Sequence, residues 1–92
     1  GIITGAEHSF ASVTKAYPNP VTGKVVFIQH PVSPQPIAIK LFNGHGDLIH
    51  QFNAGRNETS SSINVDGLAG GVYLLRIETR DEAFSEKIVV VR

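Results

Sequence analysis

The sequence predicts an all-β domain, an immunoglobulin-like antiparallel sandwich of about seven short strands. Apolar residues recur at every second position or in short β-branched runs, and no long window shows the spacing of an amphipathic helix. Turn-forming residues separate these runs at intervals of about ten residues. A chain of 92 residues, 41% of them hydrophobic, is suited to one compact core.

The expected strands span residues 12–17, 24–29, 37–42, 48–52, 61–65, 72–79 and 84–92. The first ends at "YPNP", because Pro18 and Pro20 fix φ, remove two backbone donors and disfavour helix at the residues before them. The third and fourth are expected to form a hairpin, since "NGHGD" between them supplies glycines that tolerate positive φ.

Burial can also be predicted for the second half of the chain. The polar stretch 53–60 lacks apolar alternation and is expected to be a mobile surface loop. In the strand 72–79, every second residue from Tyr73 to Ile77 is apolar on one face, so this strand is expected to lie centrally in its sheet. The apolar run 88–91 predicts a last strand that is buried on both faces. The pattern leaves the strand order open.

Composition argues against several classes of partner. Eight Lys and Arg balance eight Asp and Glu, and no segment concentrates either sign, so binding to nucleic acid is not expected. The longest apolar run is far shorter than the roughly 20 residues that cross a bilayer, so membrane insertion is not expected either. Cysteine is absent, which excludes disulfides and thiolate sites. Methionine is absent too, and the sequence is therefore expected to be a piece of a longer precursor.

Candidate catalytic and metal-binding groups are few. His45, Asp47 and His50 surround the expected hairpin turn and belong to residue types that bind metals. In a regular hairpin His50 would share a strand face with Leu48 while His45 sits in the turn, so the alternative interpretation is solvated histidines. The sequence also shows no nucleophile elbow, no acid and base pair and no phosphate-binding glycine loop. It therefore predicts no enzyme, no cofactor and no metal.

Four segments carry a family resemblance, and they are "YPNP" at 17–20 followed by Gly23, "LFNGHGDLI" at 41–49 with Gly46, "LAGGVYLLRI" at 68–77, and "EKIVVVR" at 86–92. In order and spacing they resemble the C-terminal sorting domains (Por secretion tail, type A) of cargo proteins of the type IX secretion system in Bacteroidetes. The sequence departs from that pattern in two places. Asn43 stands where many members carry aspartate, and the proline-rich segment 30–36 matches no hallmark.

The resemblance implies a secretion and sorting signal rather than a catalyst. The cargo would enter the periplasm by its own N-terminal signal, and the outer-membrane translocon and its shuttle components would recognise the folded tail. A surface sortase would then cut ahead of the domain and join the cargo to lipopolysaccharide, so that the cargo ends at the cell surface or is secreted. On this interpretation residues 1–9 end the linker to the upstream cargo domain, and residues 10–92 form the sorting domain.

The resemblance also nominates residues for contact with the translocon. Either the terminal strand pairs by its edge and offers Lys87, or the turns present a fixed shape. Tyr73 is a candidate for a side-chain contact as well, although its place in a strand favours a role in the core. The nominated residues are Pro18, Asn19, Pro20, Gly23, Gly46, Gly70, Gly71, Tyr73, Lys87, Val90, Val91 and Arg92.

Two other interpretations compete with a sorting signal. The main rival is a non-catalytic adhesion or carbohydrate-binding sandwich, which would present exposed aromatic rings on one sheet face. The chain has no Trp and only two Tyr, so it offers few aromatic rings for binding a carbohydrate. The third interpretation is a structural spacer, whose surface should tolerate substitution freely.

Overall fold

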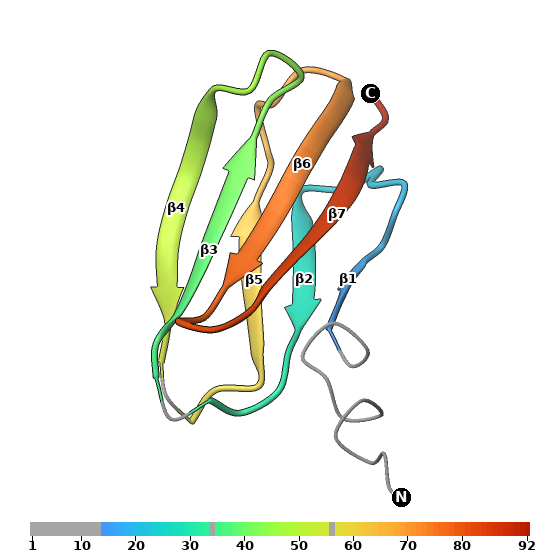
Figure 1. The fold of residues 1–92 in the computed structure, drawn as a ribbon. Coiled ribbons are helices and arrows are strands. Elements are labelled where there is room, and N and C mark those ends of the chain that lie inside the picture. The colour runs from blue at the N-terminus through green and yellow to red at the C-terminus, as the bar shows by residue number, and fades with distance from the viewer. Residues whose placement is uncertain (1–13, 34, 56) are drawn as a thin grey trace, which may run out of the picture.

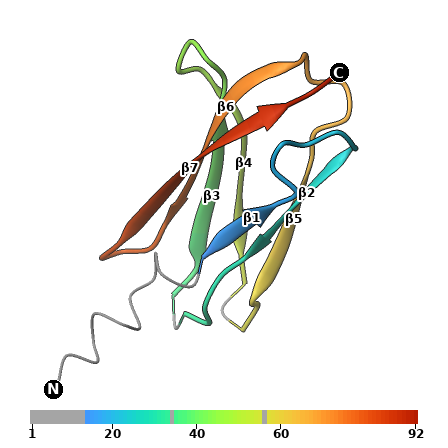
Figure 2. The same ribbon diagram turned by 90° about the vertical axis from the view of Figure 1, so that its right-hand side faces the viewer.

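The computed structural model describes residues 14–33, 35–55 and 57–92, which form two antiparallel sheets packed face to face (Figure 1). The strands are β1 (Lys15–Tyr17), β2 (Val25–Gln29), β3 (Ile37–Phe42), β4 (Leu48–Ala54), β5 (Ser60–Asn64), β6 (Gly71–Glu78) and β7 (Ala83–Val90). One sheet has the order β1-β2-β5 and the other β4-β3-β6-β7, and Figure 2 shows the first lying beside the second. The prediction of an antiparallel all-β sandwich is confirmed.

The core lies between the sheets and follows from the period-two pattern of the strands. Ile39 pairs with Ile77 and Leu41 with Leu75 across β3 and β6, and all four side chains are buried. Burial of one such aliphatic side chain contributes about 1.5–3 kcal/mol. The buried apolar residues are Ala16, Val21, Val26, Ile28, Ile37, Ile39, Leu41, Ala54, Ile63, Val65, Tyr73, Leu75, Ile77, Ile88 and Val90.

Most strand boundaries agree with the sequence pattern. The bounds of β3 and its hairpin with β4 are confirmed, and β6 lies between β3 and β7, so its predicted central place is confirmed too. The expected start of the first strand, residues 12 and 13, lies outside the described residues. β4 continues through Ala54 and β5 begins at Ser60, so the ends of the loop expected at 53–60 belong to strands instead. No helix in the described part of the chain is long and apolar enough to cross a membrane.

The last strand differs from the prediction. It ends at Val90 rather than at Arg92, and only one of its faces is buried. Ile88 and Val90 are in the core, whereas Val89 is half-buried and Val91 is 46% exposed. The apolar run therefore does not indicate burial on both faces, because the described residues form only two sheets and those of the other sheet cover only the inward face of β7.

The β3–β4 hairpin also differs from a regular ladder. Phe42 pairs with Leu48, but Leu41 pairs with His50, and the register shifts between these two pairs. An extra residue on one strand reverses the alternation of side chains beyond it. His50 and Leu48 therefore lie on opposite faces, and the expectation that they share one is wrong.

His30 anchors the segment that matched no sequence hallmark. Its ring is 2% exposed, with Nδ1 3.2 Å from the Pro31 carbonyl oxygen and Nε2 3.2 Å from Ser61 Oγ. Its backbone N–H donates to the Thr59 carbonyl at 2.9 Å. Because buried polar groups need partners, these contacts fix the end of β2 against β5.

Candidate functional site

The "YPNP" corner, residues 17–20, is joined to the last strand through Asn19. The amide Nδ2 donates to the Lys87 carbonyl at 2.9 Å, and Oδ1 accepts the Val89 N–H at 3.1 Å. Val21 continues this pairing, since its N–H donates to Val89 O at 2.7 Å and its carbonyl accepts from Val91 N–H at 2.8 Å. The segment after the corner thus acts as a short parallel strand on the outer edge of β7.

This pairing has a consequence for recognition. An unpaired strand edge is a ready template for a partner strand. From the Lys87 carbonyl to the Val91 N–H, however, the outward backbone groups named above are already bonded to Asn19 and Val21. A partner that added a strand along this stretch would first have to displace the corner.

Arg92 holds two turns together at the same end of the sandwich. Its Nε donates to the Leu68 carbonyl at 3.1 Å, Nη1 to Gly23 O at 2.9 Å and Nη2 to Val65 O at 2.6 Å. A guanidinium offers several donors in a fixed planar fork, whereas a lysine ammonium is a single point. Arg92 therefore connects the turn before β2, the turn after β5 and the end of β7.

Tyr73 is a core residue with its hydroxyl at the rim. The residue is 8% exposed, and its hydroxyl donates to the Ala69 carbonyl at 2.7 Å. A tyrosine at a strand start bonded to backbone a few residues upstream is a recurring corner of β-sandwiches. The turn it holds packs on the end of the chain, because a Cβ at Gly70 would lie 3.4 Å from Val90 O. The favoured interpretation of Tyr73 as a core residue is confirmed.

The β3–β4 turn is organised by Asn43. Its Oδ1 accepts the N–H of His45 at 2.9 Å and of Asp47 at 3.0 Å, and its carbonyl accepts from Gly46 N–H at 3.0 Å. Gly46 has φ of 87°, which L side chains rarely adopt. Aspartate offers the same acceptor atoms, so the departure from the family pattern at this position is compatible with the same turn.

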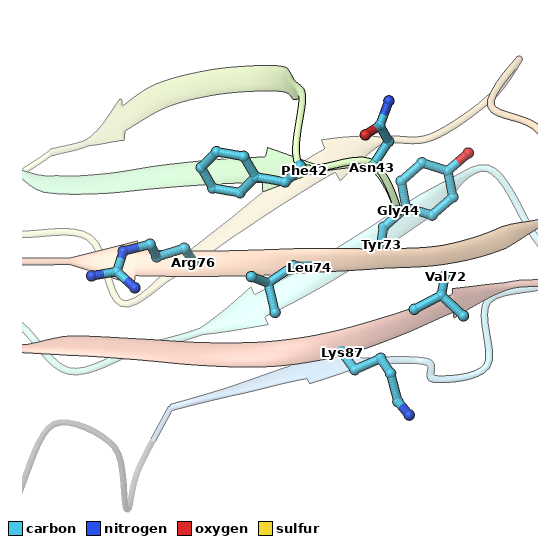
Figure 3. A pocket seen from close by; sticks show the side chains of 9 residues that line it. Phe42, Asn43, Gly44, Val72, Tyr73, Leu74, Arg76 and Lys87 are labelled. Carbon is cyan, nitrogen blue, oxygen red and sulfur yellow. The ribbon is translucent and has the colours of Figure 1, made fainter.

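The outward face of the four-stranded sheet carries an apolar groove of about 530 Å³ (Figure 3). Phe42, Val72 and Leu74 form its floor, with Val72 50% and Leu74 41% exposed. Phe42 pairs with Leu74 and Leu74 with Lys87, so the three lie in one row across β3, β6 and β7. We call this feature the outer-face groove, and it is lined by Phe42, Asn43, Gly44, Gly46, Val72, Tyr73, Leu74, Arg76 and Lys87.

Of the described charged side chains beside the outer-face groove, Lys40 and Arg76 form ion pairs with Glu78, whereas Lys87 does not join them. Glu78 accepts hydrogen bonds from Arg76 Nε and, at 3.0 Å, from Lys40 Nζ. The bond from Arg76, and after it that from Lys40, lowers the pKa of the Glu78 carboxyl below its ordinary value. Lys87 is exposed, and its ammonium forms no ion pair with any residue that the structure describes.

The nominated residues fall into two groups by burial. Tyr73 and Val90 are buried, so their side chains face the core rather than a partner. The others are exposed: Pro18, Asn19, Pro20, Gly23, Gly46, Gly70, Gly71, Lys87, Val91 and Arg92. Both X-Pro bonds of the corner are cis.

Most nominated residues belong to the corner, the turn before β6 or the end of β7, and several of them contact the last residues of the chain, whose C-terminus is marked in Figure 1. Asn19 meets β7 at Lys87, Gly23 meets Arg92, and Gly70 approaches Val90. Gly46 is on the β3–β4 turn, which lies at the same end of the sandwich as the start of β6 (Figure 1), and it lines a pocket together with Tyr73 and Lys87.

Sequence reasoning nominated Gly46, Tyr73 and Lys87, which line the outer-face groove, but it missed the apolar surface between them and the carbonyl partners of Arg92. A signal for the groove was present, because Val72 and Leu74 are apolar at positions that alternate with the core residues of β6. No local pattern indicates the partners of Arg92, since they come from turns 24 or more residues away.

His45, Asp47 and His50, which the sequence analysis considered as candidate metal ligands, are not part of a metal-binding group among the described residues. Across residues 14–33, 35–55 and 57–92, no group of three or more His, Cys, Asp and Glu side chains could hold a metal ion. His45 lies in the exposed turn, and His50 is on the strand that follows it.

Solved structures of other proteins share this two-sheet fold. The structure resembles a DUF3244 family protein with an immunoglobulin-like β-sandwich fold from Bacteroides vulgatus, with a TM-score of 0.69 and 8% identity over 84% of this chain and 82% of that one. It also resembles CopC from Methylosinus trichosporium OB3b, with a TM-score of 0.52 and 16% identity over 84% of this chain and 92% of that one. At these identities the likeness shows the fold alone, which is an immunoglobulin-like sandwich.

The sequence comparisons bear on the family. No curated protein sequence matches the chain significantly. The family model of the secretion system C-terminal sorting domain matches residues 15–91, which include all seven strands. The chain therefore belongs to the secretion system C-terminal sorting domains, a family of non-catalytic signal domains of secreted or surface cargo.

Proposed function

We propose that the domain directs an attached cargo protein across the outer membrane through the type IX secretion system. The translocon and its shuttle components recognise the folded domain in the periplasm. A surface sortase then cuts within residues 1–9, ahead of the sorting domain at 10–92, and joins the cargo to lipopolysaccharide. In this proposal the domain is the sorting signal of the cargo and a substrate of the translocon and the sortase, and it catalyses no step itself.

The interlocking of the hallmark segments carries this proposal. Asn19 fastens the corner to β7, and Arg92 fastens the turns at Gly23 and Leu68 to the end of the same strand. Segments far apart in the sequence are thus held together at one end of the sandwich, an arrangement that an unfolded tail would lack. Since the β7 edge is paired at this end, fixed turns and exposed side chains such as Lys87 are better candidates for contact than edge pairing.

A fusion of residues 1–92 to a periplasmic fluorescent reporter tests the proposal. The fusion is expressed in a Bacteroidetes bacterium that carries the machinery, and in the same strain without the translocon. The reporter should reach the surface or medium in the first strain and stay periplasmic in the second. Retention in both strains would exclude the sorting function.

The fate of the exported reporter tests the later steps. Mass spectrometry should find the reporter ending within residues 1–9 of the fused domain and carrying added lipopolysaccharide mass. An exported reporter that keeps residues 10–92 would contradict sortase removal but not export. A cut reporter without added mass would contradict anchoring alone.

One observation favours the rival carbohydrate-binding function. Tyr17 and Phe27 are 46% and 47% exposed on the outward face of the other sheet, with ring centroids 5.8 Å apart. They are also direct register partners, and such cross-strand aromatic pairs stabilise a sheet without any ligand. Calorimetric titration with saccharides distinguishes the two roles, since saturable heat that is lost in Phe27→Ser would support the rival.

A further inference from the structure

The fold itself does not account for the apolar floor of the outer-face groove. On β6 the core is filled by Tyr73, Leu75 and Ile77, while Val72 and Leu74 point to the opposite side. The outward face of an antiparallel sheet is usually polar when it meets water. Exposed apolar side chains gathered in one place mark an interaction site more often than chance. Leu74 lies between Phe42 and Lys87 on this face (Figure 3).

Charge indicates what kind of partner fits. The outward charged residues of β3, β6 and β7 are three cations, Lys40, Arg76 and Lys87, and one carboxylate, Glu78. Glu78 already binds Lys40 and Arg76, so the positive charge of Lys87 remains available at the margin of the groove. A second copy of this chain would present a second Lys87 on the same surface and no outward carboxylate of β3, β6 or β7 that is free to pair with it.

We propose that the outer-face groove docks a peptide segment of the secretion machinery that combines apolar side chains with a carboxylate. The apolar side chains lie on Phe42, Val72 and Leu74, and the carboxylate pairs with Lys87. Gly44 at the β3–β4 turn bounds one end of the groove, where a Cβ would come within 3.6 Å of Val72 O. This inference rests on the proposed export function, because it names the chemistry of the partner.

The export assay tests the groove with matched variants. The double variant Val72→Thr with Leu74→Thr keeps β-forming residues but removes the apolar floor, and Lys87→Glu reverses the charge. Their controls are Val32→Thr, at a position that is 59% exposed, and Lys24→Glu, which is exposed outside the groove. Urea denaturation of each purified domain checks that the variants fold as stably as their controls.

The groove variants should lose export while both controls export like the parent. If the parent is exported and folded groove variants are exported equally well, the groove is not the docking site, although the sorting function stands. If the parent itself is retained, the sorting function fails. In that case the peptide-binding measurements described next are the test of whether the groove is a docking site.

Binding is measured with two short synthetic peptides, one alternating Leu with Glu and the other alternating Leu with Lys. In NMR titrations the Leu-Glu peptide should shift the amides of Phe42, Leu74 and Lys87, and Lys87→Glu should weaken that binding about tenfold or more. Equal shifts with both peptides, or none with the Leu-Glu peptide, would overturn the proposed chemistry. Shifts of these amides with protein concentration alone, together with a dimer in sedimentation, would assign the groove to a second copy instead.

Discussion

Asn19 and Val89 are 70 residues apart in the sequence, yet the side-chain oxygen of one accepts the backbone N–H of the other at 3.1 Å. The same amide donates to Lys87 O, so it satisfies two groups that a neighbouring strand would otherwise pair. Replacing Asn19 with Ala should cost about 1–3 kcal/mol of unfolding free energy, because the bonds to Lys87 O and Val89 N–H are lost together with a longer one, at 3.4 Å, to Glu86 Oε2. Urea denaturation measures it, with Asn53→Ala as control, since Asn53 is exposed on β4.

Hydrogen exchange locates the effect of that substitution. The amide of Val89 should exchange faster in Asn19→Ala, while amides of the β3–β4 ladder keep their protection. Equal stability of Asn19→Ala and Asn53→Ala would show that the corner does not fasten β7.

Arg92 should not be replaceable by lysine. A lysine keeps the positive charge but cannot direct three donors to the carbonyls of Gly23, Val65 and Leu68. Both Arg92→Lys and Arg92→Ala should therefore lower the unfolding free energy by about 1–3 kcal/mol. Thermal denaturation measures the loss, and Arg80→Ala, at an exposed position, should change stability little. A fully stable Arg92→Lys would mean that charge alone matters.

The two tyrosines should respond differently to loss of their hydroxyls. Tyr73→Phe removes the hydrogen bond to Ala69 O and should cost about 0.5–1.5 kcal/mol. Tyr17→Phe should be nearly neutral, because Tyr17 is 46% exposed and its ring contact with Phe27 survives. Chemical denaturation of both variants gives the comparison. A similar cost at both positions would contradict the structural role of the Tyr73 hydroxyl.

Asn43 offers a test of the departure from the family pattern. Asn43→Ala removes the acceptor of two turn N–H groups and should cost about 1 kcal/mol. Asn43→Asp keeps that acceptor but places a second carboxylate where Nδ2 now lies 3.4 Å from Asp47 Oδ2. Its cost should therefore be smaller than that of Ala and should shrink further as salt screens the repulsion. A salt-independent cost in Asn43→Asp would rule out this explanation.

Glu78 makes the outer face sensitive to acid. Because Arg76 and Lys40 lower the pKa of Glu78 in the folded state, its contribution to stability is present above the unfolded pKa of about 4.3. That contribution is lost as the pH falls through the lower folded value. Carbon NMR of the carboxyl groups should show Glu78 titrating below the ordinary glutamate range, and Lys40→Gln with Arg76→Gln should bring it back. An unchanged titration in that double variant would refute the assigned cause.

Local alternation was enough to predict much of the fold. Strand β3 and the hairpin with β4 follow from "IAIKLF" and the glycines after it, because period-two burial and turn chemistry both act over a few residues. The burial of β7 was mispredicted, since an apolar run has the same composition whether or not a second layer covers its outer side. The side-chain faces of β4 were mispredicted beyond the register shift, which depends on how the two strands meet.

The sequence by itself determined the class of fold and the family, because alternation, turns and hallmark segments are all local. It also nominated the residues that gather at one end of the sandwich. Only the tertiary structure decided that Asn19 pairs with the edge of β7, that Arg92 binds three distant carbonyls, and that Val72 and Leu74 line an exposed groove beside Lys87. These relations join residues from different strands and turns, and strand order and packing alone determine which of them meet.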